Sequence, residues 1–362
     1  MKKQYLIIGG GHQGLAMAAH LSLSGEYVNL WNRSEANIAE IIKKKQIYCG
    51  GVLEGTAVLE HVSTKIGEVY EKTIFVTVPA NAYRDIAKML ASYVDEDTVI
   101  ILNPGRTFGA IDFMKHLQDA GCKYRPKIAE TQTIVYTCRR DSKNSCRIYA
   151  FKKDVLIAAM KKSDMGEIME RMPECMRPYF KAADNMAVTS LGNVGMILHC
   201  TPVLMNIGWI ENETVDFKYY YEGISKTIAD YIEEVDKERQ MLAEKLGVFV
   251  ESTADWMRRT YQIEGNTLYE CIRNNDYYKE IDAPATIHHR YLLEDVPCGL
   301  VPLESLGKFL GEATPYTTLI IDLACAVLKT DFRRMGRHIT KEALEALIED
   351  IRSEKNCHER YT

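Results

Sequence analysis

A glycine-rich segment near the N-terminus constrains the fold of this chain more than any other feature. It has the sequence GGGHQG and occupies residues 9–14. The apolar run before it, residues 5–8, predicts a β-strand, and the run after it, residues 15–21, predicts an α-helix. A G-x-G-x-x-G turn between a strand and a helix is typical of a dinucleotide-binding unit, although an ordinary glycine-rich turn remains the alternative.

Each residue type in this loop suits phosphate binding. Gly9 permits the tight turn, Gly11 allows a pyrophosphate to approach the backbone, and Gly14 allows the helix to pack closely on the strand. The helix N-terminus then offers its backbone N–H groups to the phosphates. We therefore expect Gly9, Gly11, His12, Gln13 and Gly14 to bind the cofactor.

The end of the second predicted strand, residues 27–31, indicates which nicotinamide cofactor binds. NAD sites usually carry Asp or Glu about 20 residues beyond the loop, where it holds the ribose 2′-hydroxyl. Here the strand ends in Asn32, Arg33 and Ser34. A guanidinium and a hydroxyl favour a 2′-phosphate, so NADP(H) is preferred. NAD(H) stays possible because Glu35 is close by.

The rest of the first half alternates between strand and helix patterns with short connections. Such alternation predicts an α/β, Rossmann-type, doubly wound parallel sheet, which we assign to a dinucleotide-binding domain of residues 1–185. We expect strands at 46–62 (several short ones), 73–78, 98–102 and 127–129, and helices at 38–45, 82–90 and 110–120.

The loops that follow the strands should surround the ligand, because ligands bind beyond the C-terminal ends of parallel strands. These loops are residues 78–80, 103–106 and 130–133. Val78 and Pro79 are expected to contact the cofactor. Arg106 is expected near the cofactor or the substrate, and a surface arginine after a Pro-Gly turn is the alternative.

The alternation of strands and helices stops around residues 150 to 185, and helical periodicity dominates from there on. This pattern predicts an all-α second domain, residues 186–362. One predicted helix covers residues 219–246 and ends at Gly247. Another covers 191–210 and carries His199 on an apolar face. Pro202 should kink this helix beside the histidine. A lone histidine on an apolar helix is more often a core residue than a catalyst.

Composition limits the class of protein and its partners. Of 362 residues, 46% are hydrophobic and 26% charged, as in soluble globular proteins. The net charge of −5, without a long basic run, argues against nucleic acid or a membrane as partner. The ten cysteines show no C-x-x-C pair or ligand spacing, so we expect no metal site and a reducing, cytoplasmic setting. The apolar run 318–328 is expected to form a buried helix, and the oligomeric state stays open.

A polar segment, residues 288–302, complements the histidine. Reduction of a compound derived from a keto acid needs an acid/base near neutral pKa, a carboxylate that orients it, and a guanidinium that binds the substrate carboxylate. His199, Asp295 and Arg290 supply one of each. An inter-helix loop with an ordinary ion pair would look the same locally.

Several of these segments together resemble the octopine/nopaline (opine) dehydrogenase family. The resemblance extends from residue 5 to about residue 337, and its order and spacing are more specific than any single segment. The segments that carry it are GGGHQG (9–14), NPGRT (103–107), ETQT (130–133), YTCR (136–139), LGN through His199, YEG (221–223), DKER (236–239) and RYLLEDVP (290–297).

This resemblance implies a reaction and a site. The family uses NADH or NADPH to reduce the imine formed between an α-keto acid, such as pyruvate, and the amino group of an amino acid. Its helical domain supplies the catalytic histidine, arginine and aspartate, which fall here on His199, Arg290 and Asp295. Arg106 and Cys138 are expected to line the amino-donor pocket.

Two residues depart from the family pattern. Cys200 follows the histidine where proline is frequent, and Phe108 stands where a small residue is common. Two other functions remain open from sequence. One is a glycerol-3-phosphate or ketopantoate type reductase, in which a lysine is the acid/base. The other is a nucleotide-sensing protein without turnover.

Overall fold

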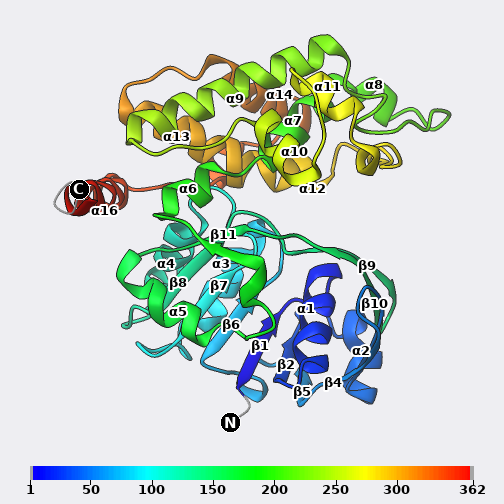
Figure 1. Ribbon diagram of the computed structural model, residues 1–362, viewed down its shortest axis with the longest axis vertical. Coiled ribbons are helices and arrows are strands. Elements are labelled where there is room, and N and C mark those ends of the chain that lie inside the picture. Colours follow the sequence, from blue (N-terminus) through cyan, green and yellow to red (C-terminus); the bar gives the residue numbers. More distant parts are fainter. Residues whose placement is uncertain (1–2, 359–362) are drawn as a thin grey trace. The chain divides into compact units, whose positions relative to one another are not determined.

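The computed structural model describes residues 3–358 and divides into two compact units, Met1–Ser190 and Leu191–Thr362. The division falls inside helix α6 (Met186–Leu191), whereas the sequence analysis places it between residues 185 and 186. The first unit is built on β-sheets and the second is helical (Figure 1). The two-part fold class expected from the sequence is confirmed.

An eight-stranded sheet forms the centre of the first unit, in the order β12-β11-β8-β7-β6-β1-β2-β5. The strands from β8 to β5 in this order run parallel, and β1 lies between β2 and β6, so that Ile7 pairs with both Leu30 and Phe75. The strands are β1 (Gln4–Ile8), β2 (Tyr27–Trp31), β5 (His61–Ser63), β6 (Thr73–Val76), β7 (Val99–Leu102), β8 (Lys127–Thr131), β11 (Val155–Ala159) and β12 (Phe180–Ala182).

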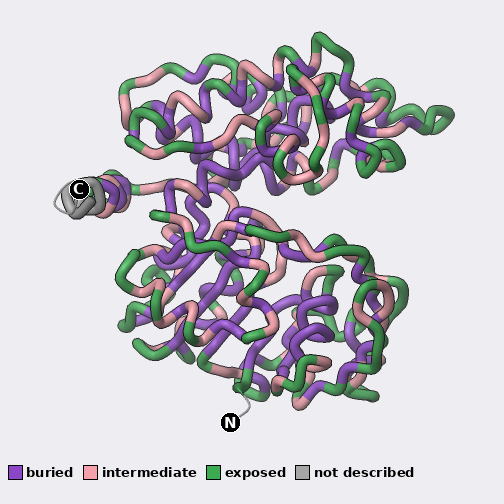
Figure 2. Tube along the Cα trace, in the orientation of Figure 1, coloured by how far each residue is buried: buried purple, intermediate pink, exposed green. Residues whose placement is uncertain are grey.

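Continuous apolar runs explain why these central strands are buried. All four residues of β6 and of β7 are buried, as is usual for parallel strands covered on both faces. Figure 2 shows the buried colour concentrated along the sheet strands. The helices of this unit are α1 (His12–Leu23), α2 (Glu35–Lys44), α3 (Tyr83–Leu90), α4 (Gly109–Asp119) and α5 (Met165–Arg171).

Two features correct the expectation of a purely parallel sheet. Strand β11 pairs antiparallel with β8, so the sheet is mixed, and strands continue beyond the point where the sequence pattern becomes helical. A second sheet, in the order β4-β3-β10-β9, packs against α1. Its strands are β3 (Gln46–Gly51), β4 (Gly55–Val58), β9 (Tyr136–Ser142) and β10 (Ser145–Phe151).

The second unit consists of helices, but their limits differ from those expected. The predicted helix 191–210 is three helices, with breaks at residues 192–194 and at Asn206. The predicted helix 219–246 begins only at Lys226 and ends at Gly247, which adopts a φ of 78°. Its main helices are α7 (Gly195–Met205), α8 (Ile207–Ile210), α9 (Lys226–Leu246), α10 (Thr253–Tyr261), α11 (Leu268–Arg273), α12 (Arg290–Leu293), α13 (Val301–Leu310), α14 (Pro315–Leu328), α15 (Phe332–Met335) and α16 (Lys341–His358).

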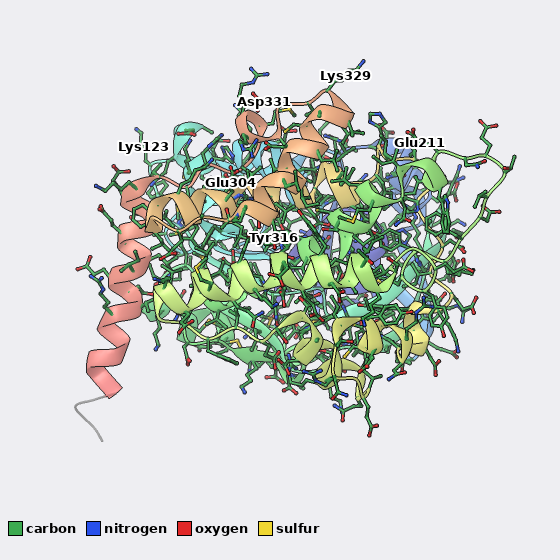
Figure 3. All side chains as sticks on the ribbon, turned by 90° about the horizontal axis from the view of Figure 1, so that it is seen from above. Lys123, Glu211, Glu304, Tyr316, Lys329 and Asp331 are labelled. Atoms are coloured by element: carbon green, nitrogen blue, oxygen red, sulfur yellow. The ribbon has the colours of Figure 1, made fainter. Side chains whose placement is uncertain are left out.

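Buried carboxylates join the helices of the second unit. Glu238 in α9 accepts hydrogen bonds from the backbone N–H groups of Tyr316 and Thr317, and so satisfies the N-terminus of α14. Glu304 in α13, which is labelled in Figure 3, accepts a hydrogen bond from Arg333. This contact holds the pKa of the Glu304 carboxyl at about 2. These pairs fix α14 against its neighbours.

Two apolar stretches of this region are parts of a folded core. The stretch Met186–Met205 is long and apolar enough to cross a membrane, but 72% of it is buried inside the protein, as in a core helix of a soluble protein. Helix α14 is only partly buried, which corrects the expectation of a buried helix, because Leu319 and Leu323 are exposed.

Candidate active site

The glycine loop between β1 and α1 has the geometry that a dinucleotide requires. Gly9 adopts a φ of 121°, which side chains disfavour. A Cβ atom on Gly14 would lie 1.7 Å from the carbonyl oxygen of Gly9, so only glycine allows this approach of helix and strand. A Cβ atom on Gly11 would meet nothing within 4 Å. Gly11 therefore faces open space at the start of α1, where a pyrophosphate fits.

His12 and Gln13, expected to bind the cofactor, contact strand β9. The Gln13 side-chain amide donates to the carbonyl oxygen of Tyr136 at 3.1 Å. The backbone N–H of Arg140 donates to His12 Nδ1 at 2.8 Å. The guanidinium of Arg140 also donates to the Gly10 carbonyl oxygen at 2.9 Å. Residues of β9 thus support the loop, and no sequence pattern marks Arg140 for this role.

The end of β2 leaves Arg33 accessible to a ligand. Asn32 accepts a hydrogen bond from the Gly10 N–H at 2.9 Å and donates to the Ser34 carbonyl oxygen, so it braces the loop. The Arg33 side chain is 81% exposed, and its guanidinium lies 4.0 Å from the carboxylate of Asp85. An ion pair this long and exposed contributes little, and leaves Arg33 able to bind a phosphate.

The three loops expected beside the ligand lie at the ends of the adjacent strands β6, β7 and β8. Val78 borders the glycine loop, because a Cβ atom on Gly9 would lie 3.0 Å from its Cγ1 atom, and Pro79 follows in the same loop. The Gly105 N–H donates to the Thr131 carbonyl oxygen at 3.0 Å. Arg106, next in the chain, has a φ of 62°, a strained conformation that is frequent at functional sites.

Arg106 and Cys138 are the residues expected at the amino-donor pocket. Both influence the pKa of Lys152. Burial and the nearby Arg106 charge lower the pKa of Lys152 to about 8, while Cys138 opposes this shift. Burial also raises the pKa of Cys138 to about 12, so its thiol stays protonated at neutral pH. The thiol donates to the carbonyl oxygen of His12 at 3.4 Å. No sequence pattern marks Lys152 as part of this site.

In the second unit, His199 and Asp295 form a buried pair. His199 lies on α7, and Asp295 lies between α12 and a π-helical turn, η6 (Val296–Leu300). Their Nδ1 and Oδ2 atoms are 2.7 Å apart. The side chains are 12% and 1% exposed, respectively. A short hydrogen bond from the ring N–H to a buried carboxylate fixes both the ring orientation and the tautomer of a histidine.

Close packing brings these two segments together. A Cβ atom on Gly299 would lie 2.7 Å from the Cβ atom of Met196, so η6 approaches α7 closely only because residue 299 is glycine. The thiol of Cys200 donates to the carbonyl oxygen of Tyr291 at 3.3 Å. The Tyr219 hydroxyl donates to the carbonyl oxygen of His199 at 2.6 Å. Pro202 lies within α7, which continues to Met205.

Aromatic rings surround the histidine. The Tyr291 ring stacks on the His199 ring, with centroids 3.9 Å apart, and the His289 ring meets Tyr291 edge-on at 4.4 Å. Burial, followed by the charge of Arg290, lowers the pKa of His289. His289 is therefore neutral near pH 7 and adds no charge beside the pair.

Arg290 is the first residue of α12 and its side chain is exposed. Its guanidinium carbon lies 5.9 Å from the centre of the Tyr291 ring. Among residues 3–352, no carboxylate lies within 4.0 Å of this guanidinium. The arrangement thus offers an acid/base on α7, together with its orienting carboxylate and a cation that can bind a carboxylate on residues 290–295.

Together, a dinucleotide-binding unit and a helical unit with a buried His–Asp pair define a nicotinamide-dependent dehydrogenase. Residues 182–328 match the family described as NAD/NADP octopine/nopaline dehydrogenase, alpha-helical domain. Residues 5–117 match the N-terminus of NAD-dependent glycerol-3-phosphate dehydrogenase. The likeness to glycerol-3-phosphate dehydrogenase therefore covers the nucleotide unit alone.

Curated relatives extend over nearly the whole chain. An opine dehydrogenase of Arthrobacter sp. (strain 1C) is 34% identical over 348 residues, which are 95% of this chain and 96% of that protein. Vitopine synthase of Allorhizobium ampelinum is 26% identical over 73% of this chain and 72% of its own length. The chain belongs to the opine dehydrogenase family, and is an NAD(P)-dependent dehydrogenase of that family.

Solved structures agree in fold. Octopine dehydrogenase with NADH and L-arginine superposes with a TM-score of 0.74 at 17% identity, over 91% of this chain and 90% of that one. Yersinopine dehydrogenase with NADP+ superposes with a TM-score of 0.75 at 14% identity, over 97% and 99%. These two structures contain NADH and NADP+, respectively.

Proposed function

We propose that this opine dehydrogenase condenses a small α-keto acid of the pyruvate class with an amino acid, and that it prefers NADPH. The observation that carries this proposal is the 2.7 Å pair of His199 and Asp295 beside the exposed Arg290. The reaction needs a proton donor and a carboxylate-binding cation, and His199 on α7 and Arg290 on α12 supply them. The reverse reaction oxidises the product with NADP+.

The cofactor fits the first unit through its backbone. Gly9, Gly11 and Gly14 would allow the pyrophosphate to approach α1, and Asn32 braces the loop by accepting a hydrogen bond from the Gly10 N–H. Arg33 and Ser34 would bind the 2′-phosphate of NADPH, because residues 32–34 at the end of β2 include no carboxylate. When bound, the cofactor supplies the hydride that reduces the iminium carbon.

His199, Asp295 and Arg290 would act on the keto acid. Arg290 binds its carboxylate through two parallel hydrogen bonds. Protonated His199 donates to the keto oxygen as the amine attacks the carbonyl carbon, then takes a proton from the nitrogen of the adduct. It donates that proton to the hydroxyl, which leaves the carbinolamine as water. Asp295 holds the ring by Nδ1 and stabilises its positive charge, so that Nε2 transfers the proton. Arg106 and Cys138 are proposed to line the amino-donor pocket.

The test is a matrix of keto acids and amino acids, run with NADPH and with NADH in the purified protein. Pyruvate, oxaloacetate and 2-oxoglutarate are each combined with a mixture of the common amino acids. Cofactor oxidation is followed by absorbance, and the secondary amine product by mass. We expect turnover with pyruvate, a higher kcat/KM for NADPH, and a product that combines both carbon skeletons.

Controls separate the other functions. Turnover of ketopantoate or dihydroxyacetone phosphate without an amino acid would favour the reductase alternative. Cofactor binding without turnover of any pair would favour a nucleotide sensor. The free thiols of the nine cysteines in the part of the chain that is described suit the cytoplasm, which we propose as the location.

A further inference from the structure

Lys152 places an ammonium group beside the C-terminal end of strand β8. It lies between β10 and β11, and its backbone N–H donates to the carbonyl oxygen of Val135 at 2.8 Å. Its Nζ atom lies 3.5 Å from the hydroxyl oxygen of Thr133, two residues beyond the end of β8. A lysine has three N–H donors, and this long contact occupies at most one of them.

The charge of Lys152 is not matched by an acid. In the part of the chain with described side chains, no carboxylate lies within 4.0 Å of its Nζ atom, although the side chain is partly buried. Lys127, another lysine of this unit, shows the usual arrangement, because its Nζ atom lies 3.1 Å from the carboxylate of Glu167. The neighbouring Lys153 is exposed to solvent. Lys152 is thus a partly buried cation without an anion of its own.

The surroundings of Lys152 raise the free-energy cost of its positive charge. Arg106 adds a second positive charge, and together with burial it lowers the pKa of Lys152 to about 8. A partly buried charge with a like charge nearby destabilises the fold unless an anion joins it. Such arrangements concentrate at functional sites.

The position of the Lys152 ammonium group relative to the sheet indicates that it contacts a ligand. Thr133 belongs to the loop after β8, beyond the C-terminal edge where doubly wound sheets bind ligands. Cys138, which influences Lys152, also contacts the Gln13 amide and the His12 carbonyl oxygen. The ammonium therefore belongs to the ligand-binding edge of the nucleotide unit.

We propose that Lys152 and Thr133 form a subsite that binds the carboxylate of the amino donor. This inference rests on the proposed function. The reaction joins two carboxylates, and Arg290 accounts for that of the keto acid. A second cation is needed for the other, and Lys152 supplies an ion-paired hydrogen bond while the Thr133 hydroxyl supplies another. The cofactor phosphates, which the glycine loop and α1 already accommodate, are the competing anion.

Kinetic measurements on matched variants distinguish the amino-donor carboxylate from the cofactor phosphates as the anion that Lys152 binds. Lys152→Met removes the charge with little change in volume, Lys152→Arg restores it, and Lys153→Met is the control. We expect Lys152→Met to raise KM for the amino acid about 10- to 100-fold. KM for pyruvate and the Kd of NADPH should stay within twofold of wild type. Lys152→Arg should recover most of the loss, and Lys153→Met should behave as wild type.

The opposite pattern overturns the subsite. A raised Kd for NADPH in Lys152→Met would assign the ammonium to the cofactor, and a raised KM for pyruvate alone would assign it to the keto acid. Carboxamides give a second comparison, because they lack the anion. L-Argininamide and L-phenylalaninamide should react equally well with wild type and Lys152→Met, whereas L-arginine and L-phenylalanine should not.

A binding measurement keeps the test independent of turnover. Lysines are reductively methylated with ¹³C, and the Lys152 signal is identified by its absence in Lys152→Met. In the NADPH complex, L-arginine or L-phenylalanine should shift this signal, and the two amides should leave it in place. A signal that shifts equally with acid and amide, or with neither, contradicts the subsite. If this signal shifts but no pair is turned over, the proposed reaction fails while the carboxylate subsite stands.

Discussion

The ring of Tyr291 lies almost parallel to the imidazole of His199, at an interplanar angle of 17° and a centroid separation of 3.9 Å. Asp295 holds the same imidazole in its plane through Nδ1. Two contacts in different directions therefore fix one histidine ring. A ring held in this way can transfer a proton repeatedly without reorientation.

The pair itself can be tested by substitution. His199→Ala should lower kcat by about 10²- to 10⁴-fold, because it removes the proton donor. Asp295→Asn should also lower kcat, since an amide cannot stabilise the protonated ring. The Kd of NADPH, measured by fluorescence, should be unchanged in both. Near-normal turnover in His199→Ala would remove this residue from the mechanism.

Tyr291 is expected to position His199 through its ring. Tyr291→Phe keeps the ring and should keep most of the activity. Tyr291→Leu loses the stack and should lower kcat about 2- to 10-fold, the range expected for one aromatic pair. Its pH–rate profile should also move relative to wild type, while Tyr291→Phe keeps the wild-type profile. Equal losses in the two variants would assign the effect to the hydroxyl instead.

Arg33 should determine the choice of cofactor. Arg33→Ala removes an exposed guanidinium that makes only a 4.0 Å ion pair, so the stability of the protein should not change. KM for NADPH should rise about 5- to 20-fold, through the lost pair with the 2′-phosphate, and KM for NADH should not. Lys43→Ala, on the neighbouring helix α2, is the control. A wild-type preference for NADH would show that the end of β2 has been misinterpreted.

Gly299 should be needed for the approach of the two catalytic segments. Gly299→Ala places a Cβ atom 2.7 Å from that of Met196, so either η6 or α7 must move. We expect a loss of about 1–3 kcal/mol in the free energy of unfolding, as for overpacked cores, and a fall in kcat. Gly208→Ala is the matched control, because its Cβ atom would meet nothing within 4 Å. Both are measured by thermal unfolding and steady-state kinetics.

Lys152 makes stability depend on pH in a predictable direction. Burial and Arg106 lower its pKa from 10.5 to about 8 in the folded protein. Between these values the unfolded chain holds a proton that the folded chain has lost, so rising pH favours the folded state. The free energy of unfolding of wild type, minus that of Lys152→Met, should rise from pH 8 to pH 10.5. Denaturant unfolding measures it, and no such trend is expected for Lys153→Met.

Sequence patterns predict the parts of the fold that depend only on residues close together in the chain. Strand β2 occupies residues 27–31 as expected, because an apolar run bounded by turn residues has few alternatives. Gly247 ends α9 as expected, since only glycine adopts its conformation easily. The second sheet was missed because β10 pairs with β3, about 100 residues earlier, and β9 joins the sheet only through β10. Short polar strands such as these carry no periodic signal.

The candidate site shows the same division. His199 and Asp295 are assigned to one site from the family resemblance, and they lie within hydrogen-bonding distance; their catalytic role stays a prediction. Phe108, noted above as a departure from the family pattern, has a φ of 56°, a conformation that favours glycine. Lys152 and Arg140 gave no signal, because their importance depends on charges and carbonyl groups that only the folded chain brings near.

The support of the glycine loop by strand β9 has a consequence for how this nucleotide unit can be altered. Arg140 and Tyr136 belong to a ribbon that lies outside the central sheet, yet they contact Gly10 and Gln13. A shortened domain that ends after β8 would keep the complete glycine motif and lose these partners. Transferring the motif alone to another protein would therefore leave out the strand that supports it. Strand β9 must be transferred together with the glycine loop.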